Sequence, residues 1–318
     1  MSHASGPDPA ATSPEFDALL TRLFASPFDA DTTPVEVLRA NFERFAAGFA
    51  DIPPGTEFVS GELGGVPVEW VTAPGSGKDS VVVLLHGGGF TIGTIESYRD
   101  MAARLSQLTG GTTVIVGYRL APENRYPAAL DDCYAAVQGV IASGVDASQV
   151  AVVGDSAGGG LTLSVLVRMR EAGGALPACA VCVSPLTDLT HSGDSVKERA
   201  HLDPIVTPAG SHCYGVRYLG SEDSDFANPG ASPLFADLHG LPPILIMVGS
   251  SEVLLDDSVR VARRIRATGG EVILDIWPRM VHIFPFFAAQ IPESRQGMEE
   301  IGGFLSARLG TAPAGSGA

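Results

Sequence analysis

Residues 154–158 read Gly-Asp-Ser-Ala-Gly and place a serine between two glycines, directly after an apolar, β-rich run that starts at Val150. A serine at a sharp strand-to-helix turn projects its hydroxyl from the carboxyl edge of a sheet, and its glycine neighbours avoid collisions within the turn. The turn also places the backbone N–H of Ala157 at a helix N-terminus, where it can stabilise an oxyanion. Ser156 is therefore a candidate nucleophile.

A phosphate-binding turn is the competing interpretation of this glycine-rich segment. A dinucleotide fingerprint requires G-x-G-x-x-G, which GDSAGG does not match. The pattern G-x-x-x-x-G-K-[ST] does not occur either, and GSGKDS at Gly75 precedes an apolar run instead of following one. The spacing favours the nucleophile turn.

A second glycine-rich string, HGGGF at His86 to Phe90, follows another apolar run. Three successive glycines forfeit side-chain contacts and add backbone entropy to the cost of folding, so this loop must allow a close approach to its backbone. Backbone N–H groups of such a loop can line an oxyanion hole, and loss of one donor typically lowers the rate ~10²- to 10³-fold.

The elements that would position these strings alternate between β-rich runs and helical periodicity from Phe58 onward. This alternation is typical of an α/β chain whose mostly parallel sheet is covered by helices on both faces. Only the first two strands resemble a hairpin, with Gly64 and Gly65 in the turn. The sequence predicts strands at 58–63, 66–73, 81–86, 112–118, 150–154, 179–184, 244–249 and 272–277, and helices at 97–109 and 128–142.

Two stretches interrupt the alternation, a helical one at 16–49 and another at 187–220, and such excursions can cover a pocket. We therefore divide the chain into an N-terminal cap segment at 1–50 and a catalytic domain at 51–310 with a cap insertion near 187–220. The remainder, 311–318, is small and polar, so we expect a disordered tail.

The net charge of −16, from 20 Lys and Arg against 36 Asp and Glu, argues against nucleic acid and anionic lipid as partners. It favours neutral substrates such as esters, amides or lactones. No apolar run reaches the ~18 residues of a membrane span, and the first residues lack the pattern of a secretion signal, so we expect a cytoplasmic protein.

Five strings follow one another along the chain: HGGGF at 86–90, YRLAPE at 118–123, YPAALDD at 126–132, GDSAGGG at 154–160 and a late Val-His pair at 281–282. In this order and spacing, over most of its length, the sequence resembles the hormone-sensitive-lipase-like branch of the α/β-hydrolases, the bacterial family IV esterases. The resemblance implies an α/β-hydrolase fold with about eight strands and a helical cap.

The resemblance also assigns roles. Ser156 matches the nucleophile, and His282 matches the general base. Gly88, Gly89 and Ala157 match the oxyanion donors. His86, the first residue of the glycine string, is structural in the family, since its ring holds the loop in shape.

The acid departs from the commonest family pattern. The family usually has an aspartate at the first position of D-x-L-x-D after the seventh strand, and Glu252 occupies that position here. Glutamate can also orient the imidazole. Asp256 and Asp257 are the alternatives, although both suit the start of the following helix. Asp155 is expected to hold the turn and its neighbouring loop rather than to react.

These assignments predict a serine carboxylesterase that hydrolyses neutral short- to medium-chain acyl esters, with no metal or organic cofactor. A lactone hydrolase with the same residues is an alternative. So is a non-catalytic binding protein like the plant gibberellin receptors, which resemble this family but lack the catalytic histidine, whereas His282 is present here. A homodimer is left open.

Substrate specificity is expected from aromatic and apolar side chains in the two cap stretches. The residues considered are Phe24, Phe28, Phe42, Phe45, Phe49, Ile205, Tyr214 and Tyr218.

Overall fold

An eight-stranded sheet runs through the part of the chain that the structure describes, residues 12–25 and 30–314 of a computed structural model. The strand order is β1-β2-β4-β3-β5-β6-β7-β8. All eight predicted strands are confirmed. Their bounds are β1 Glu57–Leu63, β2 Val66–Thr72, β3 Val81–Leu85, β4 Thr112–Val116, β5 Val150–Asp155, β6 Cys179–Val183, β7 Ile244–Gly249 and β8 Val272–Trp277.

The direction of the strands also follows the prediction. β1 and β2 form an antiparallel hairpin, and β2 is antiparallel to β4. Every later pairing, from β4 through β3 to β8, is parallel. The central strands β3 and β5 are buried along their whole length, which explains why their sequences are continuous apolar runs rather than alternating ones.

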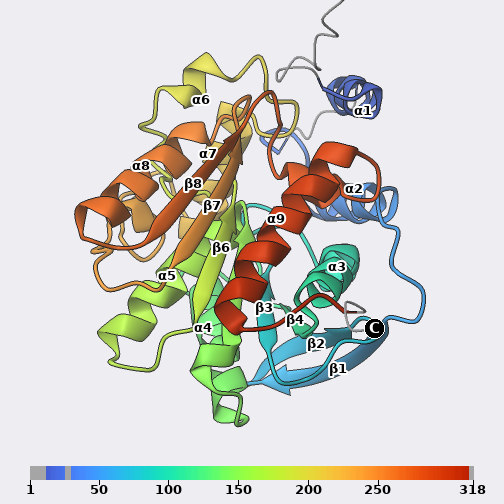
Figure 1. Cartoon of the computed structure of the whole chain (residues 1–318). Helices are drawn as coiled ribbons and strands as arrows, with labels where there is room; N and C mark the ends of the chain where they lie inside the picture. Colours follow the sequence, from blue (N-terminus) through green and yellow to red (C-terminus); the bar gives the residue numbers. More distant parts are fainter. Residues whose placement is uncertain (1–11, 26–29, 315–318) are drawn as a thin grey trace, which may run out of the picture.

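Helices cover both faces of this sheet (Figure 1). Side chains alternate between the two faces of a strand, so Val82 and Leu84 pack in one core cluster with α3 and α9, while Val83 and Leu85 pack in another with α4 and α5. α8 packs with α5 over β6 and β7. The bounds are α3 Arg99–Thr109, α4 Ala128–Ala142, α5 Ala157–Glu171, α8 Leu255–Ala267 and α9 Pro292–Leu309.

The two stretches that interrupt the alternation contain the remaining α-helices of the described chain. The N-terminal one holds α1 Pro14–Ala25 and α2 Val35–Ala47, and the 187–220 segment holds α6 Ser195–Glu198 and α7 Pro208–Leu219. Short 3₁₀ helices lie at η1 Glu96–Tyr98, η2 Ala147–Gln149, η3 Pro233–Phe235 and η4 Phe284–Phe287. α2 and α7 both contribute to one pocket at the carboxyl ends of β3 and β5.

The end of the chain differs from the expectation of disorder over 311–318. Residues 311–314 lie against α3, where the backbone N–H of Ala314 donates to the carbonyl of Gln107 at 2.9 Å. Residues 315–318 lie outside the described part, as does Phe28 of the predicted specificity set. No helix among the described residues has the length and apolar character needed to cross a bilayer.

Candidate active site

Ser156 occupies the sharp turn between β5 and α5, with φ 52° and ψ −120°. A positive φ is uncommon for a residue other than glycine, and it is maintained here by close packing of the turn. A Cβ on Gly154 would collide with the carbonyl of Gly158, and a Cβ on Gly158 would collide with the carbonyl of Leu85. Gly154 is therefore required for the turn itself to close, and Gly158 for the turn to approach β3.

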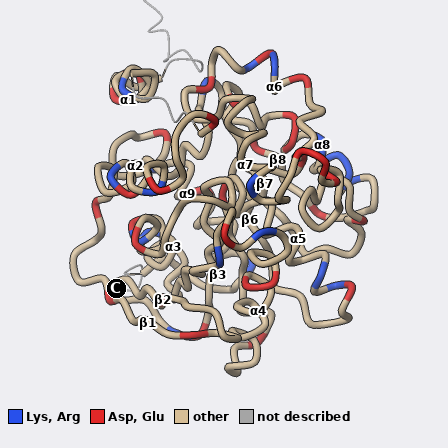
Figure 2. The backbone as a smooth tube through the Cα atoms, turned by 180° about the vertical axis from the view of Figure 1, so that it is seen from behind, with Lys and Arg blue, Asp and Glu red and all other residues tan. Residues whose placement is uncertain are grey.

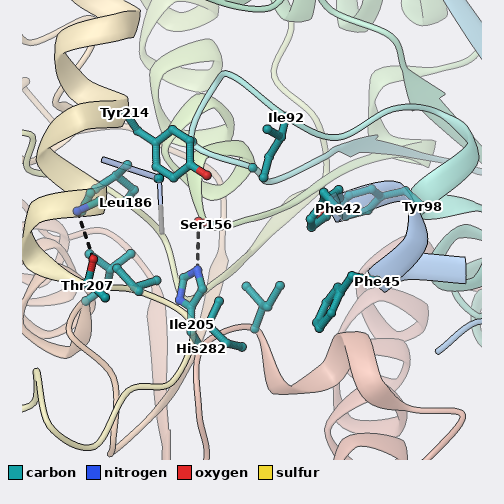
Figure 3. A pocket seen from close by; sticks show the side chains of 18 residues that line it. Phe42, Phe45, Ile92, Tyr98, Ser156, Leu186, Ile205, Thr207, Tyr214 and His282 are labelled. Carbon is teal, nitrogen blue, oxygen red and sulfur yellow. Dashed lines mark hydrogen bonds between the residues drawn. The ribbon is translucent and has the colours of Figure 1, made fainter. Parts of the chain in front are cut away.

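His282 lies in the loop after β8, and its ring faces Ser156 (Figure 3). Nε2 is 2.9 Å from Ser156 Oγ. The imidazole is almost fully buried, with 2% of its residue surface exposed. The two residues stand 126 positions apart in the sequence and meet because β5 and β8 both end at the carboxyl edge of the sheet.

Glu252 completes the chain of contacts, with Oε2 2.9 Å from His282 Nδ1. Its other oxygen accepts hydrogen bonds from Ser184 Oγ at 2.7 Å and from the backbone N–H of Gly249 at 2.5 Å. Ser184 Oγ in turn accepts from the backbone N–H of Ile283 at 3.0 Å. The carboxylate is thus held on both oxygens in a fully buried site.

The two alternative acids have other partners. Asp256 accepts a hydrogen bond from the backbone N–H of Ser195 at 2.9 Å, and Asp257 accepts from that of Thr187 at 2.7 Å. Both belong to the first turn of α8 and connect it to the 187–220 segment. Of the three carboxylates considered, the structure brings Glu252 to the imidazole.

Ser184 is a participant that the sequence reasoning missed. The sequence predicts it as the last residue of the strand at 179–184, whereas in the structure it follows β6 directly, with φ 47°. A polar residue directly after a buried strand of a parallel sheet was the available signal, because such strand ends meet at one edge.

Buried charges around His282 act in opposite directions on its basicity. Burial lowers the pKa of the imidazole, but the hydrogen bond to Glu252 and the negative charges of Glu252, Asp203 and Asp155 raise it, and the net pKa lies above its ordinary value. A more basic imidazole is better able to take a proton from a serine hydroxyl.

The glycine loop after β3 borders the same pocket. Gly88 and Gly89 line the pocket beside Ser156 and have φ of 109° and 57°. Within the described residues, no acceptor is hydrogen-bonded to the N–H groups of Gly88, Gly89 or Ala157. A Cβ on Gly89 would collide with the ring of Tyr214, so this position also requires glycine.

His86 and Asp155 hold this loop. His86 Nδ1 lies 2.8 Å from the carbonyl of Gly87, and the ring stacks on Tyr118 with centroids 4.1 Å apart. Burial lowers the pKa of His86 to about 4, so the ring is neutral. Asp155 accepts hydrogen bonds from the N–H of Gly87 at 3.0 Å and from the hydroxyl of Tyr98 at 2.8 Å. Burial raises the pKa of Asp155 to about 6.

The pocket over Ser156 has a volume of about 710 Å³ that includes space open to solvent. Its wall is mainly apolar and comes from α2, the glycine loop and the 187–220 segment (Figure 3). Of the residues predicted to set specificity, Phe42, Phe45, Ile205 and Tyr214 line it.

Three other residues of that predicted set lie elsewhere. Phe24 is 48% exposed on α1, so the expectation for this residue is wrong. Phe49 is buried next to Phe45 and Phe287, outside the pocket. Tyr218 is buried against Phe90, with ring centroids 3.8 Å apart. The helical spacing of aromatic residues in a sequence does not distinguish side chains that line a pocket from side chains that pack in the core.

A family model described as alpha/beta hydrolase fold matches residues 82–286. The chain belongs to this family. The match begins in β3 and ends in η4, so it contains the glycine loop, the turn with Ser156, Glu252 and His282.

Similarity to individual proteins shows to which branch of this family the chain is related. An acetyl-hydrolase of Streptomyces hygroscopicus is 35% identical over 278 residues, which cover 87% of this chain and 91% of that protein. The crystal structure of an esterase from the bacterial hormone-sensitive lipase family is 36% identical, with a TM-score of 0.89, and the match covers 94% of this chain and 99% of that one.

A third α/β-hydrolase, the esterase EstE5 in a crystal soaked with p-nitrophenyl butyrate, is 36% identical with a TM-score of 0.89, and the match covers 94% of this chain and 100% of that one. The resemblance to the hormone-sensitive-lipase-like branch is thereby confirmed, and the chain is a carboxylic ester hydrolase.

No group of three or more His, Cys, Asp or Glu side chains that could hold a metal ion occurs within residues 12–25 and 30–314. The Cys179 and Cys182 thiols are buried in β6, and burial raises the pKa of Cys179 to about 12, so this thiol stays protonated.

Proposed function

We propose that this protein is a serine carboxylesterase that hydrolyses neutral short- to medium-chain acyl esters. The observation that carries the proposal is the continuous set of contacts from Ser156 Oγ to His282 Nε2 and from His282 Nδ1 to Glu252, both at 2.9 Å. These are the two hydrogen bonds that a serine nucleophile, its base and the orienting acid require.

In the acylation step, His282 accepts the proton of Ser156 while Oγ attacks the ester carbonyl carbon. Glu252 holds the imidazole in the tautomer protonated at Nδ1 and stabilises the imidazolium that forms. The imidazolium then donates its proton to the leaving alcohol as the carbonyl re-forms, which leaves an acyl group on Ser156. Water repeats the sequence on the acyl-enzyme and releases the acid.

The negative charge of the tetrahedral intermediate is stabilised by the backbone N–H groups of Gly88, Gly89 and Ala157. Their freedom from acceptors in the described chain supports this role, because preorganised donors need no rearrangement when charge develops. Ala157 is also the first residue of α5, where the helix dipole favours a negative charge.

The substrate class follows from the wall of the pocket and from the net charge. The lining contains more apolar than polar groups, which suits the hydrocarbon part of an ester. The net charge of −16 disfavours anionic substrates. The name of the Streptomyces acetyl-hydrolase supports a short acyl group.

We further propose that residues 1–50 and the 187–220 segment act as the cap of a catalytic domain at 51–310. Phe42 and Phe45 from the first segment and Ile205 and Tyr214 from the second enclose the pocket, which supports this division. A cytoplasmic location stays a prediction from the sequence.

Hydrolysis of p-nitrophenyl acetate, butyrate and longer esters, with lactones in the same series, tests the proposal. We expect highest kcat/KM on short to medium acyl chains, with loss of turnover and of fluorophosphonate labelling in Ser156→Ala. If wild-type protein released no nitrophenol and took up no label, a non-catalytic binding protein would replace this proposal. Higher kcat/KM on lactones than on any open ester would favour the lactone hydrolase.

A further inference from the structure

Ser211 and His191, both in the 187–220 segment, form a hydrogen-bonded pair at the wall of the pocket. Ser211 Oγ lies 2.7 Å from His191 Nε2. Ser211 is 4% exposed and lines the same cavity as Ser156 and His282. The hydrolytic mechanism above does not use either member of the pair.

The backbone of His191 is held by a turn, and its buried imidazole is neutral. His191 has φ 52°, in the left-handed region, and its backbone N–H donates to the carbonyl of Asp188 at 3.1 Å. Burial lowers the pKa of His191, although the negative charge of the nearby Asp188 opposes this.

The pair shares one hydrogen bond, and a serine hydroxyl can make more than one. A hydroxyl has one O–H donor and two acceptor lone pairs, whereas a neutral imidazole has one donor and one acceptor nitrogen. In either tautomer of His191, Ser211 Oγ therefore keeps hydrogen-bonding capacity beyond its contact with Nε2. Because Ser211 lines the pocket, that capacity can serve a polar group of a bound substrate.

Other hydroxyls in the lining have different situations. Thr207 Oγ1 accepts from the backbone N–H of Gly210 at 3.0 Å, as Figure 3 shows. The hydroxyl of Tyr98 donates to Asp155 at 2.8 Å. Tyr214 contributes a phenol from the next turn of α7.

We propose that Ser211 is a specificity-determining residue whose hydroxyl forms a hydrogen bond with a hydroxyl group carried by the substrate, so that the pocket selects esters bearing such a group over hydrocarbon esters of equal size. This inference rests on the esterase function proposed above. His191 acts through Ser211 as a positioning residue, since its Nε2 is hydrogen-bonded to Ser211 Oγ and orients the hydroxyl.

Two pairs of substrates of matched size test the inference by proton release. Ethyl 3-hydroxybutyrate is compared with ethyl 3-methylbutyrate for the acyl side, and 2-hydroxyethyl butyrate with propyl butyrate for the alcohol side. The readout is the ratio of kcat/KM within each pair, in each variant relative to wild type, which cancels the different intrinsic reactivities of the esters.

Ser211→Ala is expected to lower this ratio about three- to tenfold in at least one pair, the range of one hydrogen bond between neutral groups, with kcat/KM on the hydrocarbon ester nearly unchanged. His191→Asn, whose side chain tolerates the left-handed backbone, should lower the same ratio. Ser221→Ala, at an exposed position beyond α7, should leave the ratio as in wild type. So should Tyr214→Phe, which removes the other hydroxyl that α7 contributes to the lining of the pocket.

An equal loss on all four esters in Ser211→Ala would indicate a structural role and overturn the inference. So would an unchanged ratio, or a ratio that falls in Tyr214→Phe instead. If Ser211→Ala does not fold, His191→Asn decides by the same ratio. Failure of the esterase proposal is recognised separately, because the wild-type protein would then hydrolyse none of the four esters in a manner dependent on Ser156.

Discussion

The carboxylate beside His282 is the position at which this sequence departs from the commonest pattern of its relatives. Glu252 is longer than aspartate by one methylene, and the structure accommodates it by holding Oε1 with Ser184 and the backbone of Gly249. Oε2 is thereby left to face the imidazole. The requirement of the site is a fixed carboxylate oxygen at Nδ1, which either acid can supply.

Replacement of this acid by its amide tests the assignment. Glu252→Gln is expected to lower kcat about 10²- to 10⁴-fold, because an amide can stabilise the wrong tautomer of His282 and carries no charge to offset the imidazolium. Asp256→Asn is the matched control and should retain activity within a few fold. If Glu252→Gln kept most of its turnover while Asp256→Asn lost it, the assignment would be wrong.

The pH dependence of kcat/KM reports the same contact. Only the neutral imidazole of His282 can accept the serine proton, so activity is lost as the pH falls through its pKa. Because that pKa is raised, we expect the acidic limb to lie above about 6.5, the ordinary value for histidine. Glu252→Gln should move the acidic limb of the residual activity to lower pH. The amide removes the negative charge that raises the pKa of His282, so less remains to offset the lowering of that pKa by burial. A wild-type limb below the ordinary value would contradict the geometry.

At the scale of elements, the turn between β5 and α5 and the loop after β3 depend on each other. Gly158 packs directly on the carbonyl of Leu85, and Asp155 holds the N–H of Gly87. The proposed nucleophile and two of the proposed oxyanion donors are therefore positioned by one contact region rather than by two independent loops.

A methyl group at Gly158 should disrupt this region. Gly158→Ala is expected to lower the free energy of unfolding by more than about 2 kcal/mol, because its Cβ would overlap the backbone of β3. Gly303→Ala is the matched control, since nothing lies within 4 Å of its added Cβ and it sits inside α9. That control should gain about 0.5–1 kcal/mol. Urea unfolding measures both, and equal stability of the two variants would refute the packing explanation.

At the scale of the whole molecule, the excess of acidic groups is spread over many elements rather than gathered at one site (Figure 2). The chain carries 36 Asp and Glu against 20 Lys and Arg. Such a distribution produces a general negative field that acts on any approaching charged substrate.

Salt should therefore affect an anionic ester more than a neutral one. For a carboxylate-bearing ester such as ethyl succinate monoanion, kcat/KM is expected to rise as ionic strength increases from about 0.01 to 0.15 M, because the screening length falls from about 30 to 8 Å. Ethyl butyrate should change little. An equal response of the two esters would show that repulsion by the net charge does not select the substrate.

The sequence alone determined the fold class, the eight strands, Ser156 and the glycine loop, because these features depend on local patterns. Continuous apolar runs identify strands buried on both faces, and glycines identify turns that exclude a Cβ. The same alternation predicts a mostly parallel sheet and two segments that could cover a pocket. It does not give the order of the strands in the sheet or the residues that line the pocket.

Tertiary structure decided which distant groups meet. It selected Glu252 over Asp256, which lies four positions later, and it added Ser184, a residue with no motif of its own. It also paired Ser211 with His191, which are 20 positions apart. Such contacts depend on where strand ends and cap helices lie in space, and no period or spacing along the chain encodes that distance.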